Sequence, residues 1–299
     1  MEYKILGRTG FNISRVSFGC MSLKAASSQD NEAIIAHAIA SGINLFDTAD
    51  LYEHGENEKL LGRALRGRRQ DVHISTKVGN RWKEDGSGWE WCPRKEYILE
   101  AIDGSLRRLD TDYTDLYLLH GGTAEDPADE VLEAFERLKD SGKIREYGIS
   151  SIRPKVIREY VKHPGIAAVM TQYSYLDRRP EEETLALLEQ NNIGVLARGA
   201  MAGGLLAGKP AHGYLDMDAE EIADRVMSFR NALPGGLDPD LAAYQYVAAH
   251  PSVTSVLAGP RNMEQLQRAV LAFSGKQLTE NEYRDILNSV RPNVYKKHR

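Results

Sequence analysis

The sequence has only two cysteines and no long apolar run, and both absences limit what the protein can be. Cys20 and Cys92 lie far apart and show no zinc-ligand spacing, so we expect free thiols in a reducing compartment. No apolar stretch approaches the ~18 residues that a membrane helix needs. The opening segment, MEYKILGRTG, lacks the apolar core of a signal peptide. These absences predict a cytoplasmic protein with no membrane partner.

A strong positive charge and metal-binding motifs are also missing. The formal net charge is -5, so nothing attracts the whole molecule to nucleic acid, although a local basic pocket for one phosphate is compatible with it. Neither H-E-x-x-H nor a paired metal-ligand spacing occurs, which predicts that no metal is bound. The chain does contain 42% hydrophobic and 27% charged residues, which suits a globular domain with a sizeable core.

Short apolar segments of strand type alternate with amphipathic helical segments along the chain. An N-terminal segment (2–14) that could form a hairpin comes first. The predicted strands are then 16–19, 43–47, 72–78, 115–120, 144–150, 167–173, 193–198 and 253–258. The predicted helices are 30–41, 56–66, 94–108, 127–141, 154–162, 181–190, stretches within 218–249, 262–273 and an extra helix at 279–290.

This alternation predicts a parallel sheet covered by helices. Eight such units favour a closed barrel over an open nucleotide-binding sheet, which should carry G-x-G-x-x-G after its first strand. Here Cys20-Met21-Ser22-Leu23 follows that strand instead. The predicted fold is therefore α/β, a (β/α)8 TIM barrel formed by residues 1–299 as a single domain, with an N-terminal hairpin and an extra C-terminal helix.

Four polar residues follow three successive strands of this barrel. Asp47 comes after the second strand, Lys77 ends the third and His120 ends the fourth. Tyr52 lies in the loop DTADLYEHG, five residues beyond Asp47. Because the C-terminal ends of barrel strands meet at one rim, we expect these side chains to converge there. Taken singly, each has a structural explanation as a helix cap, a loop aromatic, a solvated rim residue or a core histidine; only the combination favours chemistry.

Five segments together closely resemble the aldo-keto reductases: DTADLYEHGENE, STKVG, LDTDYTDLYLLH, GKIREYGIS and VLAGPRNMEQL. They occur in the order and spacing of that family, from the N-terminal segment to the helix after strand eight. Three further segments, WEWCPRKEYI, LLHGGTAEDP and QYSYLDRRPEE, look most like a bacterial subgroup. The resemblance implies an NADP(H)-dependent reductase whose partner is a small aldehyde or ketone, with Asp47, Tyr52, Lys77 and His120 as its catalytic residues.

Each implied role has a physical basis. Hydride transfer to a carbonyl carbon leaves negative charge on the oxygen, to which Tyr52 would donate a proton. A free phenol has a pKa of about 10, so a neighbouring cation, Lys77, would make it a better acid, and Asp47 would hold that cation in position. His120 would orient the carbonyl through a second hydrogen bond.

The resemblance also implies a dinucleotide that lies extended across the barrel mouth. Ser150, Ser151 and Gln172 would contact its carboxamide. Arg261 at the start of a helix would grip a 2′-phosphate, which is the basis for expecting NADPH rather than NADH. The other implied cofactor contacts are Gly19, Cys20, Met21, Asp47, Arg198, Gly199, Ala200, the glycine-rich Ala202, Gly203, Gly204 and Leu205, then Gly259 and Gln265.

Three positions depart from the usual family pattern. Ser151 stands where an asparagine is usual, Arg198 stands where many members stack an aromatic ring on the nicotinamide, and Arg268-Ala269 replaces a Glu-Asn pair that often holds adenine. In addition, the loop NRWKEDGSGWEWCPR carries three tryptophans, which could either wall an apolar substrate pocket or pack as a structural flap.

Two other functions compete with the reductase. One is an NADP(H)-sensing regulatory subunit with little turnover, and the other is a Schiff-base aldolase that uses Lys77 as its amine. The physiological substrate and the oligomeric state are left open by the sequence, because substrate loops vary on one scaffold.

Overall fold

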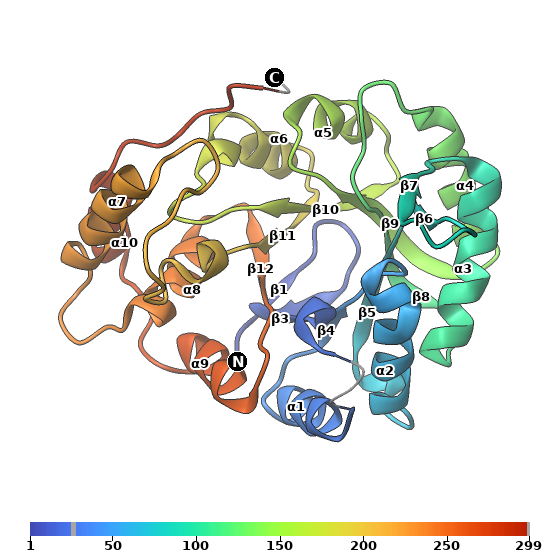
Figure 1. Cartoon of the computed structure of the whole chain (residues 1–299), viewed down its shortest axis with the longest axis horizontal. Coiled ribbons are helices and arrows are strands. Elements are labelled where there is room, and N and C mark those ends of the chain that lie inside the picture. The colour runs from blue at the N-terminus through green and yellow to red at the C-terminus, as the bar shows by residue number, and fades with distance from the viewer. Residues whose placement is uncertain (25–27, 298–299) are drawn as a thin grey trace.

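Eight parallel strands form a closed barrel at the centre of the computed structural model, which describes residues 1–24 and 28–297 (Figure 1). Each strand pairs with the barrel strands before and after it in the chain, and β12 pairs with β3 to close the ring. The strands are β3 (Val16–Gly19), β4 (Leu45–Asp47), β5 (His73–Val78), β8 (Thr114–Leu119), β9 (Ile144–Ser150), β10 (Ile166–Gln172), β11 (Gly194–Arg198) and β12 (Val253–Ala258). The predicted (β/α)8 barrel is confirmed.

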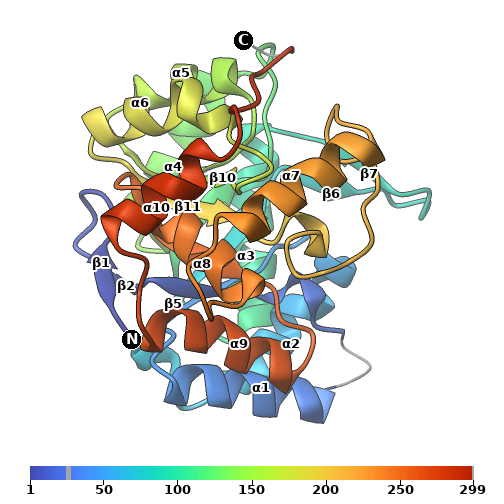
Figure 2. The ribbon, with the colours of Figure 1, turned by 90° about the vertical axis from the view of Figure 1, so that its left-hand side faces the viewer.

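Helices surround the barrel, each with an apolar face turned inward (Figures 1 and 2). In α4, for example, Val131, Leu132, Phe135 and Leu138 are buried on one face, as the sequence predicts. The helices are α1 (Ser28–Ala40), α2 (Glu56–Ala64), α3 (Lys95–Leu109), α4 (Ala128–Asp140), α5 (Pro154–Val161), α6 (Thr184–Gln190), α7 (Ala219–Asn231), α8 (Pro239–Ala249), α9 (Met263–Ser274) and α10 (Glu280–Asn288). Figure 2 shows α7 and α10 on the outer side of α8. Over residues 1–24 and 28–297, no helix combines the length and apolarity needed to cross a membrane.

The N-terminal hairpin closes the end of the barrel where the strands begin. Its strands β1 (Tyr3–Ile5) and β2 (Asn12–Ser14) are antiparallel, and Leu6 and Ile13 are buried inside the barrel end together with Leu45 and Leu196. Between the strands, Gly7 adopts a φ of +51°, and a Cβ there would lie 2.5 Å from the backbone nitrogen of Gly194. The open end of the barrel is therefore the opposite one, where the strands finish.

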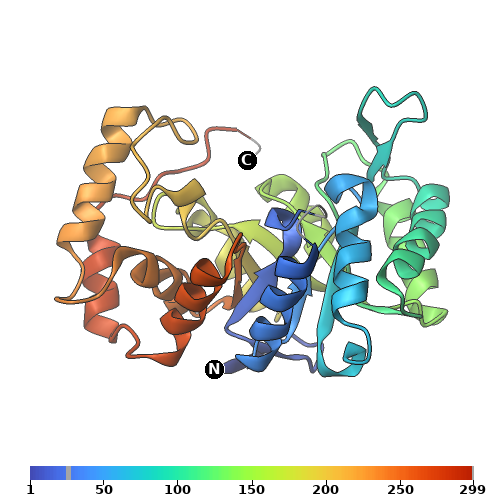
Figure 3. The ribbon, with the colours of Figure 1, turned by 60° about the horizontal axis from the view of Figure 1, so that its bottom comes forward.

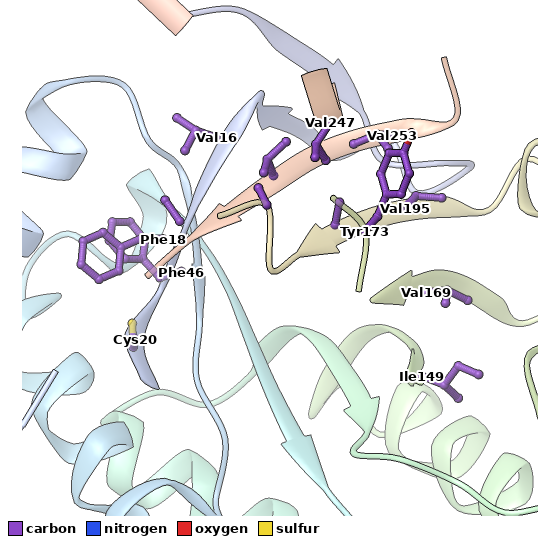
Figure 4. Packing of buried hydrophobic residues seen from close by; sticks show 14 of the residues in the cluster. Val16, Phe18, Cys20, Phe46, Ile149, Val169, Tyr173, Val195, Val247 and Val253 are labelled. Atoms are coloured by element: carbon purple, nitrogen blue, oxygen red, sulfur yellow. The ribbon is translucent and has the colours of Figure 1, made fainter. Parts of the chain in front are cut away.

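Alternate residues of each barrel strand point to two different hydrophobic layers. On β3, Val16 and Phe18 face the surrounding helices, and the Phe18 ring stacks on Phe46 of β4 with 5.6 Å between centroids (Figure 4). The residue between them, Ser17, points inward and bonds with Ser255 at 2.5 Å. This alternation follows the two-residue period of a strand and fills the barrel as a packed core.

Three details of the predicted elements are wrong. Residues 80–91, taken as a loop, contain a second hairpin of β6 (Asn80–Trp82) and β7 (Trp89–Trp91), which projects at the end opposite the N-terminus (Figure 3). The predicted strand 43–47 starts only at Leu45, and the Asn44 side chain before it bonds to the backbone of the N-terminal hairpin. The predicted helix 181–190 starts only at Thr184, because residue 183 has a φ of -158° that separates it from a preceding 3-10 turn.

Candidate active site

Three successive barrel strands deliver the predicted catalytic residues to the open rim. Asp47 is the last residue of β4, Lys77 is the penultimate residue of β5, and His120 directly follows β8. Tyr52 starts a 3-10 turn, Tyr52–Gly55, in the loop after β4. The structure brings these four residues together; their catalytic roles remain predictions.

Lys77 is the centre of this group. Its ammonium donates to Asp47 Oδ2 at 2.6 Å, to the Thr48 carbonyl at 2.6 Å and to the Tyr52 hydroxyl at 3.3 Å. An ammonium has three donors, so all of them are used. Lys77 is 1% and Asp47 3% exposed, which makes this a buried ion pair that touches the phenol.

The charge states of the group follow from its contacts. Burial alone lowers the pKa of Lys77, but the charges and hydrogen bonds of Asp47 and Tyr52 outweigh it, so the pKa of the ammonium is raised. Burial raises the pKa of the Tyr52 phenol, and the Lys77 ammonium acts in the opposite direction without reversing the shift. Tyr52 therefore holds its proton at neutral pH, as a proton donor must.

His120 completes the group through its contact with the Tyr52 ring. Its imidazole meets the Tyr52 ring edge-on, with 5.8 Å between centroids. Burial, the Lys77 ammonium and the Arg198 guanidinium lower the pKa of His120 to about 3. The imidazole is therefore neutral in the physiological range. Within the described residues its buried Nδ1 has no hydrogen-bond partner.

A strained turn carries Tyr52. Glu53 and His54, which follow it, both adopt positive φ angles of 49° and 54°, an unfavourable region for side chains larger than glycine. The His54 ring stacks on the Trp82 indole with 3.5 Å between centroids. Trp82 belongs to the second hairpin, β6–β7, so this hairpin supports the turn that holds the phenol.

The second hairpin is also tied to the loop after β8. The Trp91 indole donates to Asp126 Oδ1 at 2.8 Å, and Asp126 in turn accepts from the backbone and hydroxyl of Thr123. Trp89 is 50% exposed, and none of the three tryptophans borders either cavity described below. Of the two interpretations left open for this loop, the structure favours the structural flap.

A buried carboxyl that sequence analysis did not single out lies in the loop after β4, two residues before Tyr52. Asp50 is 7% exposed; it accepts a long hydrogen bond, 3.4 Å, from the Tyr97 hydroxyl. Burial and the nearby Glu58 carboxylate raise the pKa of Asp50 to about 7. Glu58 itself is paired with Arg108 at 2.7 Å, so the guanidinium is committed to the other acid.

Asp50→Asn should stabilise the protein more at pH 8 than at pH 5. Between the unfolded pKa of about 3.9 and the folded value of about 7, the folded state binds a proton that the unfolded state lacks, so the free energy of unfolding falls as pH rises. Because Asp50→Asn removes the carboxyl, this fall in the free energy of unfolding does not occur in the variant. Urea unfolding should show the advantage of the variant growing by about 2–3 kcal/mol between the two pH values; a constant difference would contradict the assignment.

A cavity of about 440 Å³ lies over the catalytic group. Tyr52, Lys77 and His120 border it on one side, and the loops after β8 and β9 border it on the other. The remaining lining residues are Met21, Leu51, Gly121, Gly122, Ser150, Ser151, Ile152, Arg153, Met170 and Arg198. We call this space the carbonyl cavity.

A second cavity, of about 480 Å³, adjoins it along Met21. It is bordered by the glycine-rich turn after β11, by the segment between β12 and α9, and by the start of α8. Its cations are Lys209, Arg261 and Arg268. We call this space the phosphate cavity, for the reasons given next.

The residues of the phosphate cavity suit a polyanion. Gly204 has a φ of +104°, and a Cβ there would lie 2.8 Å from the Lys209 side chain, so only glycine lets the backbone and this cation approach each other. Across the cavity, Asn262 precedes α9 as its N-cap, and its side chain accepts from the backbone N–H of Gln265 at 2.9 Å. A helix N-terminus beside an exposed Arg261 favours a bound phosphate. The donor set therefore fits the phosphates of a dinucleotide.

The predicted cofactor contacts divide between the two cavities. Ser150, Ser151 and Arg198 border the carbonyl cavity, and Met21 borders both. The phosphate cavity is bordered by Gly199, Ala200, Gly203, Gly204, Gly259, Arg261 and Gln265. The predicted cofactor contacts that border neither cavity are Gly19, Cys20, Asp47, Gln172, Ala202 and Leu205.

Gln172 is held by its own neighbours. Its carboxamide oxygen accepts from Arg198 at 2.9 Å, and its nitrogen donates to Asp177 at 2.7 Å and to Tyr214 at 3.2 Å. Its predicted contact with a cofactor carboxamide stays a prediction. Ser151 likewise uses its hydroxyl locally, as an acceptor for the backbone N–H of Arg153 at 3.2 Å.

Sequence analysis missed several residues that border these cavities. Arg153 lies three residues after Ser150, in the loop that follows β9. The only sequence signal for it is the rule that active sites of such barrels form at the C-terminal ends of the strands. Lys209 and Asp240 border the phosphate cavity but carry no motif. Arg268, which sequence analysis noted only as a departure from the family pattern, is fixed by Asp240, at 2.5 Å and 2.7 Å, and by Asp238 at 2.6 Å, a long-range pairing without any local sequence signal.

A (β/α)8 barrel with Asp47, Tyr52, Lys77 and His120 gathered at its open rim is the arrangement that the resemblance to the aldo-keto reductases implies. The model of the aldo/keto reductase family matches residues 15–290, and the chain belongs to this family. Members of the family act on small carbonyl compounds and use nicotinamide cofactors.

Individual relatives cover the whole chain. It is 46% identical to the uncharacterized oxidoreductase YqkF of Bacillus subtilis (strain 168), over 100% of both sequences. Among solved structures it is similar to the holo form of aldo-keto reductase AKR11C1 from Bacillus halodurans, with 45% identity, a TM-score of 0.94 and coverage of 100% of this chain and 99% of that one. The glycerol dehydrogenase AKR11B4 from Gluconobacter oxydans is 26% identical, with a TM-score of 0.84 and coverage of 98% and 97%.

Proposed function

We propose that the protein reduces aldehydes or ketones to alcohols with NADPH, and that Tyr52 is the general acid. The observation that carries this proposal is Tyr52, which borders the carbonyl cavity and whose hydroxyl lies 3.3 Å from the buried Lys77 ammonium. NADPH, when bound, supplies the hydride. The residues of the chain supply the proton and the orientation.

Tyr52 gives its proton to the carbonyl oxygen as negative charge develops there. The phenolate that this leaves lies against the Lys77 ammonium, whose charge stabilises it. Asp47 accepts a hydrogen bond from the same ammonium at 2.6 Å and fixes its position beneath the phenol. His120, neutral and edge-on to the Tyr52 ring, orients the carbonyl oxygen by hydrogen bonding.

The same contacts weaken the aldolase alternative. A Schiff base forms from a neutral amine, whereas Lys77 has a raised pKa and donates all three of its hydrogens. Single-turnover oxidation of bound NADPH by a panel of aldehydes and ketones tests the proposed activity directly. Turnover with at least one carbonyl supports the reductase; NADPH binding without turnover of any carbonyl would favour the regulatory subunit.

The proposed preference for NADPH rests on Arg261. Arg261→Gln should weaken NADPH binding about 10-fold and leave NADH binding within about 2-fold, because only NADPH carries a 2′-phosphate for a charge-assisted hydrogen bond. Fluorescence titrations at one fixed salt concentration measure both. Arg66→Gln, at an exposed ion pair with Asp110, is the matched control and should leave both affinities unchanged. Equal losses for the two cofactors would refute the role of Arg261.

A further inference from the structure

The lining of the carbonyl cavity contains two arginines and no acid. Arg153 and Arg198 border the cavity, and neither forms an ion pair with any of the residues that the structure describes. The other cation of the lining, Lys77, is already neutralised by Asp47. The cavity therefore carries an uncompensated positive charge. The charges of Lys77 and Arg198 contribute, with burial, to the lowered pKa of His120, which is neutral.

Arg198 lies on the cofactor side of this cavity. It ends β11, its Nη1 donates to Gln172 Oε1 at 2.9 Å, and the next residue, Gly199, already borders the phosphate cavity. Its position between the two cavities suits contact with the bound cofactor. It gives no independent information about the substrate.

Arg153 lies on the opposite side. It directly precedes α5, in the loop after β9, and does not border the phosphate cavity. Its guanidinium reaches across the rim and Nη1 donates to the carbonyl of Gly122, two residues beyond His120. That bond uses one of five guanidinium N–H groups, and the others have no partner in the described part of the chain.

The phosphates of a dinucleotide do not require Arg153. The phosphate cavity has cations of its own, Lys209, Arg261 and Arg268, together with the N-terminus of α9. Arg153 is thus a half-buried, unpaired guanidinium beside the catalytic group, on the side away from the phosphate cavity.

We infer that Arg153 binds an anionic group, a carboxylate or a phosphate, on the carbonyl substrate. This rests on the proposed reductase function and specifies its substrate class: aldehydes or ketones that carry a negative charge near the reacting carbonyl. A guanidinium presents two parallel N–H groups that match both anions, and partial burial of the site strengthens the contact. Arg153 is a specificity-determining residue in this scheme, while proton transfer belongs to Tyr52.

The test compares pairs of aldehydes in which one member carries an anionic group and the other is a neutral analogue. The carboxylate pair is 4-carboxybenzaldehyde against 4-methylbenzaldehyde, and the phosphate pair is glyceraldehyde 3-phosphate against glyceraldehyde. The wild-type protein should have the higher kcat/KM for the charged member of at least one pair, and the better pair identifies the anion. Arg153→Gln should lower kcat/KM for that charged member about 10- to 100-fold and change the neutral member less than about 3-fold.

Two controls keep the inference separate from the proposed function. Arg145→Gln changes an exposed arginine at the opposite end of the same strand, β9, and should have no effect on either member. The Kd of NADPH, from fluorescence, should be unchanged in Arg153→Gln; a loss equal to that of kcat/KM assigns the guanidinium to the cofactor and overturns the inference. Turnover of neutral aldehydes without preference for charged ones also overturns it and leaves the reductase intact, whereas no turnover of any carbonyl refutes the reductase itself.

Discussion

Tyr52→Phe should lower the single-turnover rate of carbonyl reduction about 1,000-fold and leave NADPH binding within about 2-fold of wild type. The substitution removes one hydroxyl, which lies 3.3 Å from the Lys77 ammonium on a residue that borders the carbonyl cavity. Without it, charge that develops on the carbonyl oxygen receives no proton from the protein. Stopped-flow oxidation of preloaded NADPH measures the chemical step without contributions from cofactor exchange.

The control for this experiment is Tyr113→Phe, which removes a phenolic hydroxyl near the start of β8, at the opposite end of the barrel. That variant should react at the wild-type rate. If Tyr52→Phe kept more than about a tenth of the rate, the proton would come from another group. His120 would then be the next candidate, because it is the remaining polar side chain against the phenol ring.

The barrel could be predicted because the local sequence of its strands is itself typical of β-strands. The predicted strands 16–19, 144–150 and 253–258 match β3, β9 and β12 without any change of bounds. Each combines β-branched or aromatic residues with a flanking polar or glycine residue, and the apolar residues of each are buried, so local preference and tertiary position agree. Once eight strands were placed, the rule that barrel strand ends share a rim was enough to group Asp47, Lys77 and His120.

The supports of the site were not predictable, because they depend on contacts between distant segments. Nothing near His54 in the sequence indicates that Trp82 stacks on it, since the pairing exists only after the β6–β7 hairpin folds back over the rim. That hairpin closes through Gly86 and Gly88, both with positive φ, on a loop that reads locally as irregular. Sequence analysis missed Arg153 for a related reason. Its proposed role depends on a guanidinium without an acidic partner, and pairing between distant residues cannot be read from a sequence.

Lys77→Met should strongly reduce activity and also destabilise the fold, by about 3–5 kcal/mol. The ammonium holds the phenol from below, so its loss should lower the rate of reduction at least about 100-fold. The substitution also leaves the Asp47 carboxylate, 3% exposed, without the charge that compensates its burial. Urea unfolding measures the loss, with Arg284→Met as the control, because that arginine forms an exposed pair on α10 worth less than about 1 kcal/mol.

Adding Asp47→Asn to Lys77→Met separates stability from catalysis. The double variant removes the unpaired charge, so it should regain part of the lost free energy of unfolding while its activity stays strongly reduced. The single variant should also recover stability as the pH falls from 8 to 5, because burial raises the pKa of Asp47, which Lys77 no longer opposes. The folded state then binds a proton at pH values where the unfolded carboxyl, with a pKa of about 3.9, does not. A double variant no more stable than Lys77→Met at pH 8 would show that the penalty arises from lost packing of the lysine stem and not from the buried carboxylate.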